Sequence, residues 1–442
     1  MLHRLCAAAA DAVWGPATVI LMLAAGIYFT VGTGGFQLLG GRIWLRATLF
    51  SLFRPRESAD PKALSPFQSL TVALAGTLGT GNIVGVAAAI TTGGAGAVFW
   101  MWMAAFFGMM TAYAENVLGI IHRRKTPQGE WNGGAMMYIE HGLKCRGAAV
   151  LYAVLCMTAA LGMGNIVQIN SVSQAMNDAF SVPPVITGIV AAVMTGTVLI
   201  GGLKRVASFT EKLIPALSVI YIAACLAVIT AFLPRLPAAF IEIFKSAFST
   251  KAVGGGVLGA ALTGIRRGVA TNEAGLGSSV MVHSCADVEH PSEQGMWGMF
   301  EVFVDTIVVC TLTALAILVS GANDGTADGA VLSARAFEPV FGSFASPFIA
   351  VSIALFAFST LIGWSCYGER CFIYLFGEKS VLIYRLVFSA AVVLGSVMRI
   401  QLAWDISDVL NGLMALVNVP ALLLLSPQVF RETRELRVRY AA

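Results

Sequence analysis

Long apolar segments separated by short polar ones make up most of this 442-residue chain. A window of about 20 residues, the length of helix that crosses a bilayer core, finds eleven apolar spans. They lie near residues 15–34, 67–92, 96–121, 147–178, 183–202, 207–233, 254–282, 296–320, 344–375, 379–400 and 404–427. The first lacks a small-residue cleavage site and is too long for a removed signal peptide, so it counts as a helix. The pattern predicts an all-α integral membrane protein with eleven transmembrane helices.

Composition agrees, because only 12% of the residues are charged and 57% are apolar, whereas soluble domains have about 25% charged residues. The net charge of +4 is explained by basic loops, so no nucleic-acid partner is expected. Eight cysteines without a CxxC pair are expected to be packing residues. The five histidines lack metal-ligand spacing and no nucleophile–base set is recognisable. We expect neither an enzyme nor a cofactor.

The lysines and arginines set the orientation, since cytoplasmic loops retain positive charge during insertion. With eleven spans, most of the 28 fall inside if the N-terminus is outside and the C-terminus inside. This assignment places Arg266 and Arg267 among the inner clusters. The basic tail, residues 428–442, would lie beside anionic lipid of a plasma membrane, which in a bacterium is the inner membrane.

One extra helix followed by ten suggests two halves of five, the second inverted. The expected divisions are 1–66 (extra helix and basic loop), 67–233 (first repeat), 234–427 (second repeat) and 428–442 (tail). Glycines cluster in the first helix of each half, at 76–85 and at Gly254, Gly255, Gly256, Gly259, Gly264 and Gly268. Paired glycine-interrupted helices indicate an inverted-repeat transporter with its site at the membrane midplane. The alternative is that these glycines only allow close helix packing.

The second span is predicted to break near Gly79. Gly76, Gly79 and Gly81 each weaken a helix by about 1 kcal/mol relative to alanine. Irregular backbone at this depth is tolerated only inside protein or beside a cavity. Freed carbonyl oxygens suit sodium, and N–H groups at the helix restart suit a carboxylate.

Several sequence blocks carry a resemblance to a known family. They are Gly79–Val86, Phe99–Trp102, Gly133–Ile139, Arg267–Gly275, Phe303–Thr306, Phe358–Glu369 and Asn411–Asn418. In these the chain resembles the alanine or glycine:cation symporters, the sodium-coupled alanine carriers. The resemblance implies the leucine-transporter (LeuT) fold, and import of a small neutral amino acid, alanine or glycine, with sodium by alternating access. The chain departs from the family pattern at Ala135, Met136, Met137, Ala270, Thr271, Cys366 and Val417, which bears on the substrate more than on the transport class.

Candidate site residues follow from the break and the resemblance. The predicted substrate-binding residues are Gly79, Thr80, Gly81, Asn82, Gln168, Thr360 and Trp364, and the predicted sodium ligands are Gly76, Gly79, Ser359 and Thr360. Each has a plainer alternative: an interhelical hydrogen bond for Gln168, hydroxyls bonded to their own helix for Ser359 and Thr360, and ordinary packing for Trp364.

Other polar residues within spans are also candidates. Asn272 and Glu273, placed near the inner end of the seventh span, are a possible cytoplasmic gate. Glu115 and Asp305 lie inside spans and are expected to pair with an inner arginine, in a structural or a coupling role.

Three rival functions compete with sodium symport. A proton-coupled carrier on the same fold is the main alternative, and it is disfavoured because no carboxylate is clearly placed at the break. An intramembrane enzyme lacks a catalytic set, and a channel lacks rings of charge or a filter repeat.

Overall fold

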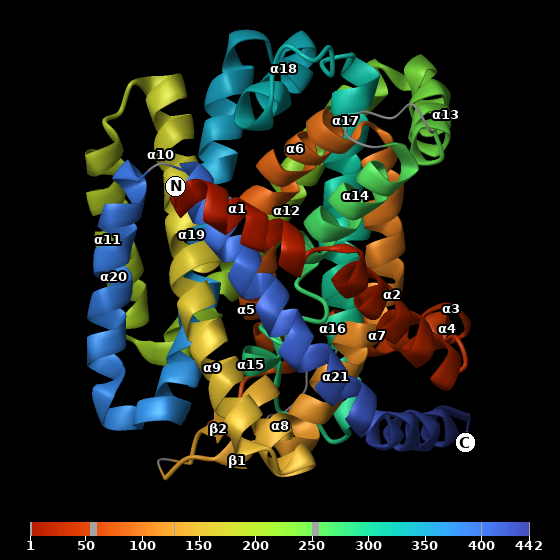
Figure 1. The fold of residues 1–442 in the computed structure, drawn as a ribbon, viewed down its shortest axis with the longest axis vertical. Coiled ribbons are helices and arrows are strands. Elements are labelled where there is room, and N and C mark those ends of the chain that lie inside the picture. Colours follow the sequence, from red (N-terminus) through yellow and green to blue (C-terminus); the bar gives the residue numbers. More distant parts are fainter. Residues whose placement is uncertain (1, 54–59, 128, 250–255, 399, 442) are drawn as a thin grey trace.

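A computed structural model describes residues 2–53, 60–127, 129–249, 256–398 and 400–441, and in them the chain is almost entirely helical (Figure 1). The one described sheet is a hairpin of β1 (Arg124–Lys125) and β2 (Trp131–Asn132). Eight described helical stretches are long and apolar enough to cross a membrane, and two shorter apolar helices accompany them. The all-α membrane class is confirmed, while the count of eleven spans remains a prediction.

The N-terminal part comprises α1 (Leu2–Val13), α2 (Pro16–Gly32), α3 (Phe36–Leu39) and α4 (Gly41–Ala47). Figure 1 places α1 across the upper part of the last helix, with α2 descending beside α7.

The helices up to α13 follow in the order α5 (Pro66–Thr77), α6 (Val84–Gly93), α7 (Gly96–His122), α8 (Ala135–Leu143), α9 (Arg146–Leu161), α10 (Val167–Phe180), α11 (Pro184–Leu199), α12 (Gly202–Ala231) and α13 (Leu236–Ala247). A π-helical segment at residues 162–166 joins α9 to α10.

The remaining helices are α14 (Gly256–Asn272), α15 (Val280–His283), α16 (Pro291–Val302), α17 (Thr311–Ser320), α18 (Gly329–Phe341), α19 (Ala345–Phe376), α20 (Val381–Val397) and α21 (Ile400–Ala441). A second π-helical segment, residues 303–310, joins α16 to α17.

Burial separates central from peripheral helices. Helices α5, α7 and α16 are mostly buried, whereas α11 and α20 pair at one side of the molecule and expose apolar side chains such as Val193 and Leu386 (Figure 1). An exposed apolar helix face fits contact with lipid chains.

The predicted break in the second span is confirmed. Helix α5 ends at Thr77, Leu78 and Gly79 are extended, and a 3₁₀ turn at Thr80–Asn82 leads into α6. The Asn82 carbonyl oxygen Oδ1 accepts a hydrogen bond from the Gly79 N–H at 2.9 Å. A side chain of the break thus replaces a helical partner that the break removes.

The second half also contains a helix break, but the break does not lie at the glycines that were expected to mark it. Helix α14 runs unbroken past Gly259, Gly264 and Gly268, and Gly254 and Gly255 lie outside the described residues. Helix α14 ends at Asn272. Residues 273–279 form a non-helical connection to α15, with positive φ at Glu273, Gly275 and Gly277.

The glycines of α14 serve close packing instead. A Cβ atom on Gly264 would lie 2.3 Å from the Ala97 carbonyl oxygen of α7. Two helix backbones approach closely there, as small residues permit in membranes. The predicted place of the second break was therefore wrong.

The assignment of Arg266 and Arg267 to the inner side remains a prediction, but both have partners within the protein. Arg266 forms ion pairs with Asp408, at 2.6 Å, and with Asp11, at 3.3 Å. Asp11 lies on α1 and Asp408 near the start of α21, and Figure 1 shows α1 crossing the upper part of α21, away from the C-terminus. Arg267 stacks on Trp404, also near the start of α21. These arginines pair within the bundle, so they carry no information on orientation.

Replacing Gly264 with alanine tests the close crossing of α14 and α7. Because the new Cβ would overlap a backbone oxygen, we expect Gly264→Ala to lower stability by about 1–3 kcal/mol. Thermal unfolding of the purified protein in detergent measures this change. Gly147→Ala is the control, since a Cβ there has no atom within 4 Å. Equal unfolding temperatures for both variants would contradict the packing role.

Candidate functional site

Four predicted substrate and sodium residues meet at the first break. Gln168 of α10 accepts hydrogen bonds through Oε1 from the Thr80 N–H, at 3.2 Å, and from the Thr80 hydroxyl, at 3.0 Å. A Cβ on Gly79 would lie 2.5 Å from the Thr360 hydroxyl oxygen and 3.2 Å from Gln168 Oε1. Only a glycine lets the broken backbone come this close to both side chains.

The π-helical segment before α10 helps to aim Gln168. Gln168 Nε2 donates to the Met163 carbonyl oxygen at 3.1 Å, inside that segment. Single π-helical turns leave a local irregularity in helix hydrogen bonding and occur frequently at functional sites. Gln168 therefore bonds both to the first break and to the π-helical segment before its own helix, so the interhelical hydrogen bond of the plainer alternative is present at the break.

Hydroxyl and carbonyl oxygens gather where α19 passes the first break. The Ser359 and Thr360 hydroxyls lie 3.5 and 3.3 Å from the Leu78 carbonyl oxygen. Both also bond to the Phe356 carbonyl of their own helix, as the plainer alternative held. An all-oxygen set of this kind suits a hard cation such as sodium. Leu78 was missed, although its position directly before Gly79 marks it as the residue where the helix ends.

Gly76 has a different setting from the other predicted sodium ligands. It lies within α5, and a Cβ there would be 2.4 Å from the Tyr367 hydroxyl oxygen. A Cβ on Gly363 would lie 2.5 Å from the Gly76 nitrogen, so α5 and α19 cross at this pair. The observed role of Gly76 is to permit that crossing.

Asn82 connects the first break to Asp305. Asn82 Nδ2 donates to Asp305 Oδ1 at 2.7 Å, and the Thr306 hydroxyl donates to Asp305 Oδ2 at 2.8 Å. Asn272 Nδ2 in turn donates to the Thr306 hydroxyl at 3.1 Å. A carboxylate does lie at the break, contrary to expectation, because the π-helical segment that contains it packs against residues 80–82.

Glu273 is the first residue of the second break, and its Oε1 accepts a hydrogen bond from the Trp364 indole N–H at 2.7 Å. Asn272 is the last residue of α14. Both residues are buried, and their position near the inner end and their role as a gate remain predictions.

Trp364 is completely enclosed, with 1% of its surface exposed. Its ring lies 5.4 Å from the Tyr367 ring, centroid to centroid. Trp364 also packs against Gly164 of the π-helical segment before α10, where a Cβ would lie 2.2 Å from Trp364 Cβ.

Glu115 and Asn418 hold the second break. The Gly277 N–H donates to Glu115 Oε1 at 2.8 Å, and Asn418 Nδ2 donates to the same oxygen at 2.7 Å and to the Gly275 carbonyl at 3.0 Å. The Tyr138 hydroxyl donates to Asn418 Oδ1. Asn418 was not a predicted site residue, although its sequence block was among those that carried the resemblance.

The prediction that Glu115 and Asp305 pair with an arginine is wrong. In the described part of the chain, no lysine or arginine nitrogen lies within 4 Å of the carboxylates of Glu115, Glu273 or Asp305. Their partners are backbone N–H groups, amides, hydroxyls and an indole. Burying a carboxyl group without such bonds would cost several kcal/mol.

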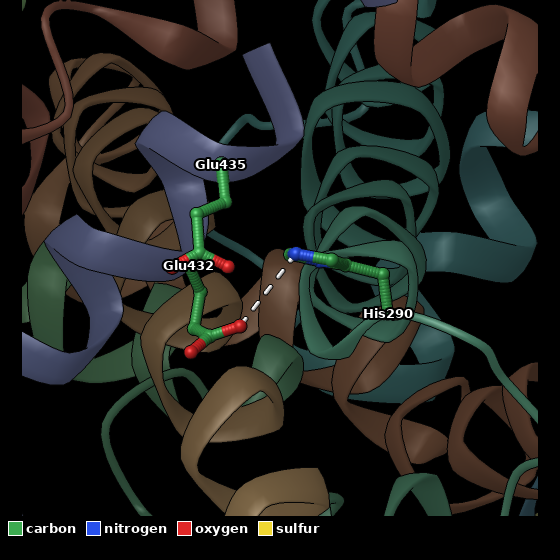
Figure 2. Close-up of side chains that lie close together, drawn as sticks. All are labelled: His290, Glu432 and Glu435. Carbon is green, nitrogen blue, oxygen red and sulfur yellow. Dashed lines mark ion pairs between the residues drawn. The ribbon is translucent and has the colours of Figure 1, made fainter. Parts of the chain in front are cut away.

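A separate cluster between the C-terminal helix α21 and the start of α16 has the composition of a metal site. His290 Nε2 lies 3.6 Å from Glu432 Oε2, with Glu435 nearby (Figure 2). His290 Nδ1 accepts a hydrogen bond from the Ser292 N–H, so in the neutral ring the proton is on Nε2. Arg431 supplies positive charge 3.0 Å from Glu432. The cluster therefore fits a link between α21 and the start of α16 better than a metal site.

Comparison with known proteins places this geometry in context. The family model described as the sodium:alanine symporter family matches residues 1–441. A sodium/alanine symporter of Methanococcus maripaludis is 41% identical, over 96% of this chain and 94% of its own. A probable sodium/glutamine symporter of Bacillus subtilis is 37% identical, over 98% and 91%.

Solved structures share the fold. MhsT in complex with L-phenylalanine matches with a TM-score of 0.60 at 14% identity, over 86% of this chain and 97% of that one. A manganese transporter of Eremococcus coleocola matches with a TM-score of 0.53 at 14% identity, over 84% and 78%. The LeuT-like fold class is thereby confirmed.

Asn418→Leu tests how the second break is held. It would leave the Glu115 carboxylate and the Gly275 carbonyl each short of one buried hydrogen bond, so we expect a loss of about 2–4 kcal/mol. Thermal unfolding in detergent measures it. The control is Asn177→Leu, whose side chain bonds at an exposed helix end. Wild-type stability in the Asn418 variant would show that the break holds without this residue.

Proposed function

The chain belongs to the sodium:alanine symporter family, and from this membership we propose that it imports alanine or glycine with sodium through a site at the first helix break. It is a multi-pass membrane transporter that uses sodium as coupling ion, not an enzyme. The finer statements below concern its substrate, its site and its orientation.

The convergence of Gly79, Thr80, Gln168 and Thr360 carries the proposal. These residues come from α19, from α10 and from the break between α5 and α6. Thr80 is hydrogen-bonded to Gln168, and Gly79 packs against the side chains of Gln168 and Thr360. Backbone N–H groups from Thr80 to Asn82 are proposed to receive the amino-acid carboxylate, as helix starts commonly do. The Thr80 N–H would then exchange its present bond to Gln168, and the Asn82 N–H its bond to the Gly79 carbonyl. Gln168 is proposed to hold this segment in place.

Sodium is proposed to bind beside the substrate, at the Leu78 carbonyl and the Ser359 and Thr360 hydroxyls. Their spacing around one carbonyl supports this assignment. Gly76 and Gly79 remain proposed contributors through their backbone carbonyls. Since the same stretch of backbone would contact both solutes, binding of one would organise the site for the other.

The substrate is proposed to be small because Trp364 lies one helical turn beyond Thr360 and is enclosed. Family membership alone leaves side-chain size open, since one relative is named a probable glutamine symporter. The indole ring is the residue of this chain best placed to exclude longer side chains.

The proposed orientation has the N-terminus outside and the C-terminus inside a plasma membrane. The basic residues of the C-terminal tail support it. Alternating access would then open the first break to each side in turn.

A proton-coupled carrier is the second candidate, favoured only by the contact of Asp305 with Asn82. The family and the relative from Methanococcus favour sodium.

Uptake into liposomes tests the coupling ion. We expect labelled alanine to accumulate with an inward sodium gradient, and not with a proton gradient in choline buffer. Thr360→Ala should raise the sodium concentration for half-maximal uptake at least about fivefold, because it removes one sodium-facing hydroxyl, a bond of about 1 kcal/mol.

Thr360→Ser, which keeps the hydroxyl, is the matched control and should retain wild-type sodium dependence. Undiminished uptake in choline under a proton gradient would overturn the sodium assignment. An equal change in alanine affinity at saturating sodium would instead move Thr360 into the substrate pocket.

Trp364→Ala tests the size limit. We expect weaker alanine binding together with new competition by leucine, because a rigid indole excludes the larger side chain at a cost of about 1–3 kcal/mol. Each 1.4 kcal/mol is a tenfold change in affinity. Competition against labelled alanine measures both effects. If alanine affinity falls and leucine still does not compete, Trp364 is a packing residue.

A further inference from the structure

The indole of Trp364 is held at its nitrogen by a residue from another element. Its N–H donates to Glu273 Oε1 at 2.7 Å, and the Ser278 hydroxyl donates to Glu273 Oε2 at 2.5 Å. Glu273 and Ser278 both belong to the second break, whereas Trp364 belongs to α19. A hydrogen bond of this kind joins the two elements across the centre of the molecule.

The Glu273 carboxyl group is itself fixed. It is 4% exposed, its backbone adopts a left-handed conformation with φ of 58°, and it starts the non-helical segment. Hydrogen bonds in a low-dielectric interior are strong, and an unmade one is costly. Its position therefore depends on the break and in turn determines where the indole N–H can point.

The other edges of the ring are confined by packing. Tyr367 lies on one side, and the backbone of Gly164 leaves room for Trp364 on another. Packing confines the ring, but the bond to Glu273 is the directional contact that selects one orientation. Thr360 is one turn earlier on the same helix face, so the orientation of the ring bears on the space beside Thr360.

We propose that Glu273 is a positioning residue for substrate selection, which fixes the Trp364 indole as the wall that limits side-chain size. This inference rests on the proposed function at the same site. Glu273 contacts neither the Leu78 carbonyl nor the hydroxyls of α19 through any described hydrogen bond, so it acts on the substrate through Trp364.

Paired substitutions test the inference by competition of leucine against labelled alanine. Glu273→Ala removes the acceptor, and we expect leucine to compete at least about tenfold better than in wild type. Glu273→Gln keeps an acceptor oxygen and should retain wild-type selectivity. Trp364→Phe keeps a ring without the N–H and should gain leucine tolerance, with no further gain when combined with Glu273→Ala.

Thr311→Val is the matched control. It removes the acceptor of another indole, since Trp102 Nε1 donates to the Thr311 hydroxyl at 2.7 Å, and this hydroxyl has no described hydrogen bond to Glu273 or Trp364. We expect unchanged selectivity. If Glu273→Ala does not fold, Trp364→Phe and Glu273→Gln still decide: an unchanged leucine competition in Trp364→Phe overturns the inference.

Fluorine NMR of protein labelled with 5-fluorotryptophan separates this inference from the proposed function. The Trp364 signal is identified by its loss in Trp364→Phe. It should shift in Glu273→Ala and stay in place in Glu273→Gln and Thr311→Val. A wild type that binds no alanine with sodium would overturn the proposed function while this readout still stands. An unmoved signal in Glu273→Ala overturns the positioning role.

Discussion

Backbone groups freed by a helix break inside a membrane have no water to bond to, and this constraint organises the centre of the molecule. Each break has its own polar side chains. Asn82 accepts the Gly79 N–H at the first, while Glu115 and Asn418 hold Gly277 and Gly275 at the second. At each break, buried side chains thus replace the partners that a continuous helix would have supplied.

The same constraint explains the buried carboxyl groups. Glu115, Glu273 and Asp305 bond to N–H and O–H donors, whereas an arginine partner was expected for Glu115 and Asp305. Ion pairs within a low-dielectric interior often fail to repay desolvation, whereas several directed hydrogen bonds satisfy one group in place. Hydrogen bonds from Asn82 through Asp305 and Thr306 to Asn272 link the two breaks into one polar unit.

The sequence predicted the structure correctly where neighbouring residues alone decide it, as at the first helix break. Three glycines beside threonine and asparagine located the first break, and the meeting of Gln168 and Thr360 with it followed from the resemblance. Glycine count failed in α14, because a glycine that permits packing and one that ends a helix read alike. Asp305, Leu78 and the link between Glu273 and Trp364 depend on contacts between distant segments, which no local pattern encodes.

The N-terminal helix has a consequence for how the protein is assembled. The Trp14 indole donates to the Asp408 carbonyl oxygen, a partner 394 residues later, and Arg266 bridges Asp11 and Asp408. At about 5 to 20 residues per second, ribosomes make the second partner some 20 to 80 s after the first. Helix α1 therefore cannot complete its docking until α21 has been made, long after α1 itself.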